Sequence, residues 1–518
     1  MSIKLCGSEK DIFTESCKEG RNMTITYVTA GPDGEEPNAF TIKNREEIYI
    51  PKAPPPQPPI QRGSIITNLG SLRQINKQLN VACAVFFLFV YGGMDFAHSA
   101  GWNQTLNTTA TQLFKCSWFI GVLAGAAVAS LAMTFLPKMT FYVLGGIMQL
   151  IGSIIFTCAP FDYGCLLAAR YVAGAGIGLI TVPFLIHSAE VASDNHRGVS
   201  GSMEQCGLAL GIAIQVIYDT QWVEDKEASV NEVHGIIGIV FSLLGLGMTA
   251  LSIESPIHHL RRNQEEEARD CHRKLLGSFN NAEDLAFEEL KLYVEESQKR
   301  TFCQELWSSV VPFIKLLLYR GFVAFSFSLP LSESLIKSAI QTEGYISCWP
   351  VTVWGMVRLL GALVAQGFLD KIGRKLLSLV GLLCMAILML CMAVSYADPA
   401  NVLLTYYMNQ VWKLGVAFQA FAGLFVCSSS VYLGEAFPMK VKPLLVGYIV
   451  GFEQTVHIIN IVGYNKGSET FFYHYYLSVG IILFVGVIFF GLVIPETKKI
   501  TLREAGKRFQ RLHNIRLF

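Results

Sequence analysis

The spacing of apolar runs constrains the fold of this chain more than any other feature. About twelve runs have the length of roughly 20 residues at which a helix crosses a bilayer, about six on each side of a charged block between Glu254 and Trp307. The runs lack the two-residue alternation of a membrane β-barrel, and only helices or closed barrels satisfy backbone polar groups in hydrocarbon. The pattern predicts an all-α polytopic membrane protein, with about twelve transmembrane helices in two pseudo-symmetric bundles of six.

The charged block and the polar ends divide the chain into five predicted segments. Residues 1–78 form a cytoplasmic arm that we expect to be disordered, because it contains a proline-rich spacer between Pro51 and Pro59. The two bundles occupy residues 79–253 and 318–494, and the first helix of the second bundle is predicted over 318–341. Residues 254–317 form a cytoplasmic linker with short helices, and residues 495–518 form a basic cytoplasmic tail.

Composition excludes several classes of function. Charged residues make up 16% of the chain, below the roughly 25% of average soluble proteins, which fits burial in lipid. A net charge of +1 argues against a nucleic-acid partner. We find no nucleotide-binding loop, metal-ligand cluster or nucleophile elbow, so we expect neither an enzyme nor a cofactor or metal.

The charges in the loops predict the orientation. Lysines and arginines gather in the loops and tail of one side, whereas the loop after the fifth helix is acidic, with Asp219 and Glu224. By the positive-inside rule both termini are cytoplasmic. Two glycosylation sequons, at Asn103 and Asn107, then fall in the first outer loop. We expect a multi-pass protein of the plasma membrane that works as a monomer.

Five motifs follow one another from the fourth helix to the tail. They are Arg170-x3-Gly174 with Glu190, Arg197-Gly198 and Gln205; Glu254-Ser-Pro256; Asp370-x2-Gly373-Arg374; Glu435-Ala-Phe-Pro438; and Pro495-Glu-Thr-Lys498. In this order and topology they resemble the motifs of the sugar porter family of the major facilitator superfamily. The resemblance implies a secondary transporter that works by alternating access, with its solute site between the bundles.

Charged residues at the predicted cytoplasmic helix ends form a candidate conformational latch. Opposite charges on facing helix ends can hold one conformation closed and separate in the other. The alternative is that they only anchor the helix ends and set the topology. The residues are Glu190, Arg197, Asp370, Arg374, Glu435 and Lys442.

The candidate solute site departs from the family. Counted from Arg320, the family's stretch of sugar-binding amides on the seventh helix is matched by Glu333-Ser-Leu-Ile-Lys337-Ser-Ala339, in which both amides, the glycine and the asparagine are gone. Glu333 and Lys337 are spaced to pair along one helix face. Arg358 would then face the cavity and bind a carboxylate or phosphate, or all three charges form a structural cluster. The predicted solute-binding residues are Gln205, Arg358, Glu333, Lys337 and Gln454.

Asp95 and Arg170 form the candidate proton-coupling pair. Asp95 falls at the acid of the family's first-helix motif, and proton-driven members pair that acid with the fourth-helix arginine, here Arg170. Burial raises the pKa of such a carboxyl group and the cation lowers it, so movement of the helices could trigger proton uptake. The alternative is a fixed interhelical salt bridge.

Three functions remain open at this point. The first is a secondary transporter of a small polar solute, sugar-like or anionic, with or without protons. The second is an organic-ion transporter, which shares a similar block after the sixth helix but has a longer first outer loop. The third is a sensor or scaffold that binds a solute without transporting it, which the lost amides favour. Saturable flux and counterflow separate a transporter from a sensor.

Overall fold

The computed structural model describes residues 65–102, 111–221, 229–276, 281–344, 349–465, 468 and 470–515. All regular elements within these ranges are helices. Most of the arm predicted over residues 1–78 lies outside the described residues, and so do Asn103 and Asn107, the predicted glycosylation sites.

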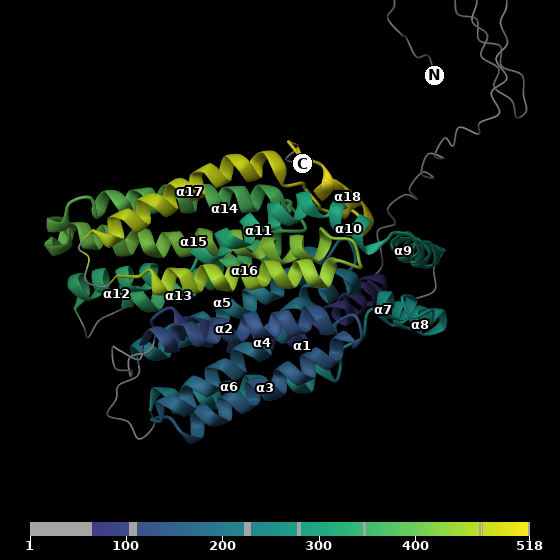
Figure 1. The fold of residues 1–518 in the computed structure, drawn as a ribbon, viewed down its shortest axis with the longest axis horizontal. Coiled ribbons are helices and arrows are strands. Elements are labelled where there is room, and N and C mark those ends of the chain that lie inside the picture. The colour runs from purple at the N-terminus through teal and green to yellow at the C-terminus, as the bar shows by residue number, and fades with distance from the viewer. Residues whose placement is uncertain are drawn as a thin grey trace, which may run out of the picture. The chain divides into compact units, whose positions relative to one another are not determined.

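The helices form two bundles that lie side by side (Figure 1). The first bundle consists of α1 (Ile65–Ser99), α2 (Thr111–Ala132), α3 (Lys138–Cys158), α4 (Tyr163–Val191), α5 (Arg197–Gln221) and α6 (Val230–Thr249). The second consists of α11 (Val310–Phe325), α12 (Leu329–Glu343), α13 (Trp349–Phe368), α14 (Arg374–Ser395), the short η1 (Pro399–Leu403), α15 (Thr405–Glu435), α16 (Lys442–Val462) and α17 (Phe471–Val493).

Among the described residues, eleven helical segments are long and apolar enough to cross a membrane, and α11 and α12 together make one of them. The helix α5 adds a twelfth, since it packs against α1, α13 and α15 but is more polar than the rest. Its polarity comes in part from Glu204 and Gln215, which are both buried. The chain is therefore a multi-pass integral membrane protein, and the predicted all-α fold of twelve crossings is confirmed.

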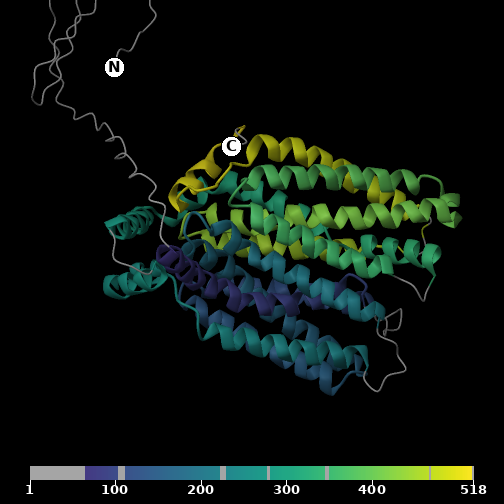
Figure 2. The same ribbon diagram turned by 180° about the vertical axis from the view of Figure 1, so that it is seen from behind.

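The linker forms short helices at one end of the bundles, which we call the linker end; the opposite end is the far end. Both ribbon views show these helices and the tail helix gathered there (Figures 1 and 2). They are α7 (Pro256–Leu260), α8 (Glu265–Leu276), α9 (Asn281–Lys299), α10 (Phe302–Ser308) and α18 (Leu502–Gln510). The helix α1 begins at Ile65, earlier than the predicted residue 79. At the other boundary α11 begins at Val310 rather than at 318, so the linker is shorter than predicted.

The predicted seventh helix is interrupted. Helix α11 ends at Phe325 and α12 begins at Leu329, so the expectation of one helix over 318–341 was wrong. Pro330 near the start of α12 explains the break, because proline has no N–H to donate to the carbonyl of Ser326, four residues earlier. The carbonyl of Ser326, left without a partner within the helix, accepts hydrogen bonds from Arg358 at 3.1 Å and from Gln419 at 3.2 Å.

The glycines of α4 allow the first bundle to pack closely. A Cβ atom at Gly174 would lie 2.3 Å from the carbonyl oxygen of Trp118, and one at Gly178 would lie 2.2 Å from that of Val122. Both carbonyls belong to α2, so only glycine permits this approach of the two helices. The resulting bundle fixes the positions of α2, α4 and α5, which pack against the second bundle.

Candidate functional site

A small cavity lies between the two bundles. Its volume is about 30 Å³, enough for one or two water molecules and too small for a sugar. The lining is mostly apolar on the first bundle, with four aromatic rings, and mostly polar on the second: Phe89, Phe96, Trp118, Phe119, Val122, Ile177, Thr181, Glu204, Leu208, Arg320, Val450, Glu453, Gln454 and His457. The structure therefore shows this site collapsed between the bundles.

Arg320 joins the two bundles at one wall of this cavity. Its guanidinium donates to Glu204 of α5 at 2.6 Å, to Glu453 of α16 at 2.6 Å and to the hydroxyl of Ser429 at 2.7 Å. Ser430 of α15 donates to the second oxygen of Glu204. All these groups are almost completely buried. One guanidinium thus holds a carboxylate from each bundle, so separating the bundles here must break a buried charged contact.

Aromatic and charged contacts close the far end. The rings of Trp102 in the first bundle and Trp354 in the second lie 5.5 Å apart, and both are about 1% exposed. Nearby, Lys115 of α2 lies 3.7 Å from Glu333 of α12. Glu333 therefore pairs across the bundles and not with Lys337, so the predicted Glu333–Lys337 pair was wrong. The break before α12 moves both residues to the far end, where Lys337 lies over the ring of Phe472 at 5.0 Å.

Four of the predicted latch residues meet at the linker end. Asp370, just after α13, accepts from the backbone N–H groups of Gly198 and Val199, at the start of α5, at 2.9 and 3.0 Å. Arg197 lies 3.4 Å from Glu435, and Arg374 lies 3.1 Å from the same carboxylate. Charges on facing helix ends thus close the linker end.

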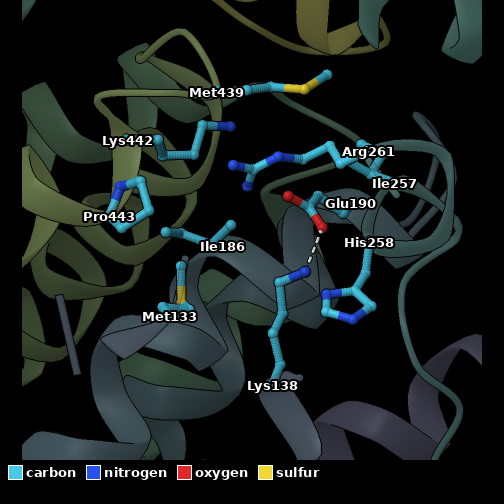
Figure 3. A pocket seen from close by; sticks show the side chains of 10 residues that line it. All are labelled: Met133, Lys138, Ile186, Glu190, Ile257, His258, Arg261, Met439, Lys442 and Pro443. Atoms are coloured by element: carbon cyan, nitrogen blue, oxygen red, sulfur yellow. Dashed lines mark hydrogen bonds and ion pairs between the residues drawn. The ribbon is translucent and has the colours of Figure 1, made fainter. Parts of the chain in front are cut away.

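The other two latch residues lie beside this group without an ion pair to it. Glu190 accepts from Lys138 at 2.8 Å, a contact drawn in Figure 3, and Lys442 donates to the carbonyl of Gly434 at 2.9 Å. Figure 3 places both at a small pocket where the first bundle, the linker and the second bundle meet. Lys138 was not among the predicted latch residues, although it is a cation at a predicted helix end.

Asp95 and Arg170 form a direct ion pair inside the first bundle. Their closest atoms are 3.2 Å apart and both side chains are 0% exposed. Arg170 also donates to the carbonyls of Phe114 at 3.1 Å and of Asp95 at 3.2 Å. The pair predicted from the sequence is therefore present, and it lies outside the set of residues that line the cavity.

Arg358 does not face the cavity, contrary to the sequence expectation. It donates to the carbonyl and the hydroxyl of Ser326 at 3.1 Å each and to the side-chain oxygen of Gln419 at 2.9 Å. Its guanidinium also lies 5.3 Å from the ring centre of Phe327. The break between α11 and α12 explains this position, because its free carbonyl needs a donor.

Of the two amides predicted to bind solute, one lines the cavity and the other does not. Gln454 lines the cavity, whereas Gln205 is buried and absent from its lining. Among the described residues, the side-chain nitrogen of Gln205 has no hydrogen-bond partner. The sequence interpretation missed Glu204 and Arg320, although charged residues inside apolar runs are a general sign of a functional site.

Two bundles of six crossings around a closed central cavity define a carrier of the major facilitator type. The model of the family "Sugar (and other) transporter" matches residues 78–509, so the chain belongs to that family. The predicted family resemblance is therefore confirmed, and the chain is a transporter rather than an enzyme.

The chain is 23% identical over 478 residues to "Probable polyol transporter 6" of Arabidopsis thaliana, covering 83% of this chain and 93% of the relative. It is 24% identical over 462 residues to "D-xylose-proton symporter-like 3, chloroplastic" of the same plant, covering 81% of each. The proton:xylose symporter XylE from E. coli, solved with 6-bromo-6-deoxy-D-glucose, aligns with a TM-score of 0.67. At 19% identity over 85% of this chain and 100% of the other, that likeness concerns the fold.

Proposed function

We propose that the protein carries a small polyhydroxylated solute, of the sugar or polyol class, across a membrane by alternating access in symport with protons. The observation that carries this proposal is the closed cavity between the bundles, with Arg320 held by Glu204 from one bundle and Glu453 from the other. Contacts at both ends exclude solvent, and opening either end gives access from one side of the membrane only. The relatives named above transport polyols or xylose by their names, which supports this solute class.

The charges at the cavity favour a neutral or cationic solute over an anionic one. Two carboxylates and one guanidinium line it, and Arg358, the cation expected to bind an anion, is occupied by Ser326 and Gln419. Aromatic rings such as Trp118 and Phe119 offer flat apolar faces, and Gln454 and Thr181 offer hydrogen bonds. That combination suits a sugar ring, whose faces are apolar and whose rim carries hydroxyls.

We assign proton coupling to Asp95 with Arg170, and the conformational latch to Arg197, Asp370, Arg374 and Glu435. The linker end faces the cytoplasm in this proposal, because lysines and arginines gather at that side of the chain. The protein works as a monomer in the plasma membrane, since one chain supplies both halves of the cavity.

Uptake by the purified protein in liposomes tests the proposal. Labelled D-xylose, D-glucose, sorbitol and a hexuronate are offered with and without an inward proton gradient. Empty liposomes and liposomes with the Arg320→Met variant are the controls. We expect saturable uptake of at least one neutral solute, enhanced by the gradient and lost in the variant. Binding without any flux or counterflow would instead identify the protein as a sensor, and uptake of the hexuronate alone would refute the solute class.

A further inference from the structure

A buried histidine of α6 faces the Asp95–Arg170 pair. The Nε2 atom of His234 lies 3.4 Å from Oδ1 of Asp95, and both side chains are 0% exposed. We propose that Asp95 and His234 together hold one transferable proton, so that His234 is a second proton-holding residue of the coupling site. This inference rests on the proposed proton symport and adds to it a base on a different helix.

The hydrogen bonds around His234 fix which ring nitrogen carries a hydrogen. Gln215 donates its amide nitrogen to the carbonyl of Trp102 at 3.1 Å, so its oxygen points toward the histidine. That oxygen lies 2.9 Å from Nδ1 of His234 and also accepts from the hydroxyl of Tyr218. An amide oxygen can only accept, and the single hydroxyl hydrogen of Tyr218 is already used. Nδ1 of His234 must therefore carry the hydrogen.

This assignment leaves two acceptors face to face on the other side of the ring. In the neutral form with hydrogen on Nδ1, Nε2 carries a lone pair. It faces Oδ1 of Asp95, a carboxylate oxygen, and no described residue donates to Nε2. Two lone pairs at 3.4 Å repel each other, whereas a proton placed between them makes a charge-assisted hydrogen bond. One proton held by the pair, on either atom, satisfies both acceptors.

The other charged and titratable groups around the ring favour a single proton. His98 stacks on His234 with 4.2 Å between ring centres, and two imidazolium ions at that distance would repel. Arg170 already supplies one positive charge to Asp95. A second added proton is therefore opposed from two sides. The groups that face the ring come from three helices: Tyr91, Asp95 and His98 of α1, Tyr218 of α5 and Phe156 of α3. Arg170 of α4 reaches the pair through Asp95.

Nitrogen NMR of the purified protein, with histidines labelled, tests the pair without a transported solute. The chain has ten histidines, so the His234 signal is identified as the one missing from His234→Gln or, if that variant does not fold, as the one that moves in Asp95→Asn. Between about pH 5 and about 8, where imidazole ordinarily titrates, we expect a hydrogen on Nδ1 throughout and a proton shared at Nε2. Asp95→Asn should abolish the shared proton. A neutral ring with its hydrogen on Nε2, or spectra that Asp95→Asn leaves unchanged, would overturn the proposal.

A transport measurement then separates this inference from the proposed function. Liposomes that contain a pH-sensitive dye report proton entry driven by a D-xylose gradient, with His474→Gln as the matched control at the exposed far end of α17. We expect His234→Gln to lose at least tenfold of the proton entry and His474→Gln to keep it. Proton entry through His234→Gln at the wild-type rate would refute the inference. If the wild type moves no protons while the NMR result holds, the symport proposal fails and the proton pair remains.

Discussion

Replacement of Asp370 by asparagine should open the linker end. Asp370 uses its two oxygens to accept from Gly198 and Val199, the first free N–H groups of α5. Asparagine keeps one acceptor oxygen but turns an NH₂ group toward the other N–H and removes the negative charge from the start of a helix. One lost hydrogen bond to a charged group costs about 1.5–3 kcal/mol, and the lost helix-end interaction costs about 0.3–1 kcal/mol.

Together these two losses remove about 2–4 kcal/mol of the free energy that stabilises the closed form relative to the open form. Since each 1.4 kcal/mol is a factor of ten, the ratio of protein open at the linker end to closed protein should rise roughly 30- to 700-fold. Pairs of spin labels on cysteines introduced at Phe135 and Ile372, which are both exposed, report the opening as a longer distance. The labels require a background in which the 13 native cysteines are replaced.

Asp398→Asn is the matched control. Asp398 also accepts from a backbone N–H at the start of a helix, that of Ala400 at 2.9 Å, but at the far end and within one bundle. It should leave the distance between the labels unchanged. If Asp370→Asn and Asp398→Asn gave the same distance distribution as the wild type, the contact between Asp370 and α5 would not hold the linker end closed, and the reasoning would be refuted.

Three further changes test other contacts. Gly198→Ala should open the linker end in the same assay, because its Cβ would lie 2.5 Å from Oδ1 of Asp370; an unchanged distance would show that the carboxylate adjusts at no cost. Arg320→Met should lower stability by about 3–5 kcal/mol, because it leaves two buried carboxylates without their cation, and an unaltered unfolding temperature in detergent would contradict this. Burial raises the pKa of Glu254, but His187, Lys138 and two backbone N–H groups lower it to about 2. A depressed pKa stabilises the folded state above the ordinary value of 4.5, so the stability lost in Glu254→Gln should be constant above about pH 5 and shrink toward pH 2; a pH-independent difference in unfolding temperature would count against it.

The sequence was sufficient for the fold because hydrocarbon leaves few solutions for apolar runs of this length. It also predicted which charges meet at helix ends, since Asp370, Arg374 and Glu435 lie at the end of a run whichever way the helix is rotated. Asp95 and Arg170 were found through a family motif.

The central cavity could not be predicted in the same way. The register of Glu333 and Lys337 depends on the break before Pro330, and counting along an unbroken helix placed both residues too deep. Arg358 was assigned to a solute because the acceptor that it binds, the carbonyl of Ser326, is free only where the helix stops, and an unbroken helix was predicted there. Hydrogen-bond partners of this kind depend on the rotation of each helix, which apolar runs do not specify.

The position of Arg320 has a kinetic consequence for a carrier. If the bundles separate around the cavity while it is empty, Arg320 must lose Glu204, its partner in the first bundle, and the released carboxylate has no cation beside it. A bound solute can offer hydroxyl donors to that carboxylate and reduce the cost. The loaded protein should therefore reorient faster than the empty one, and exchange of solute across the membrane should outpace its net movement.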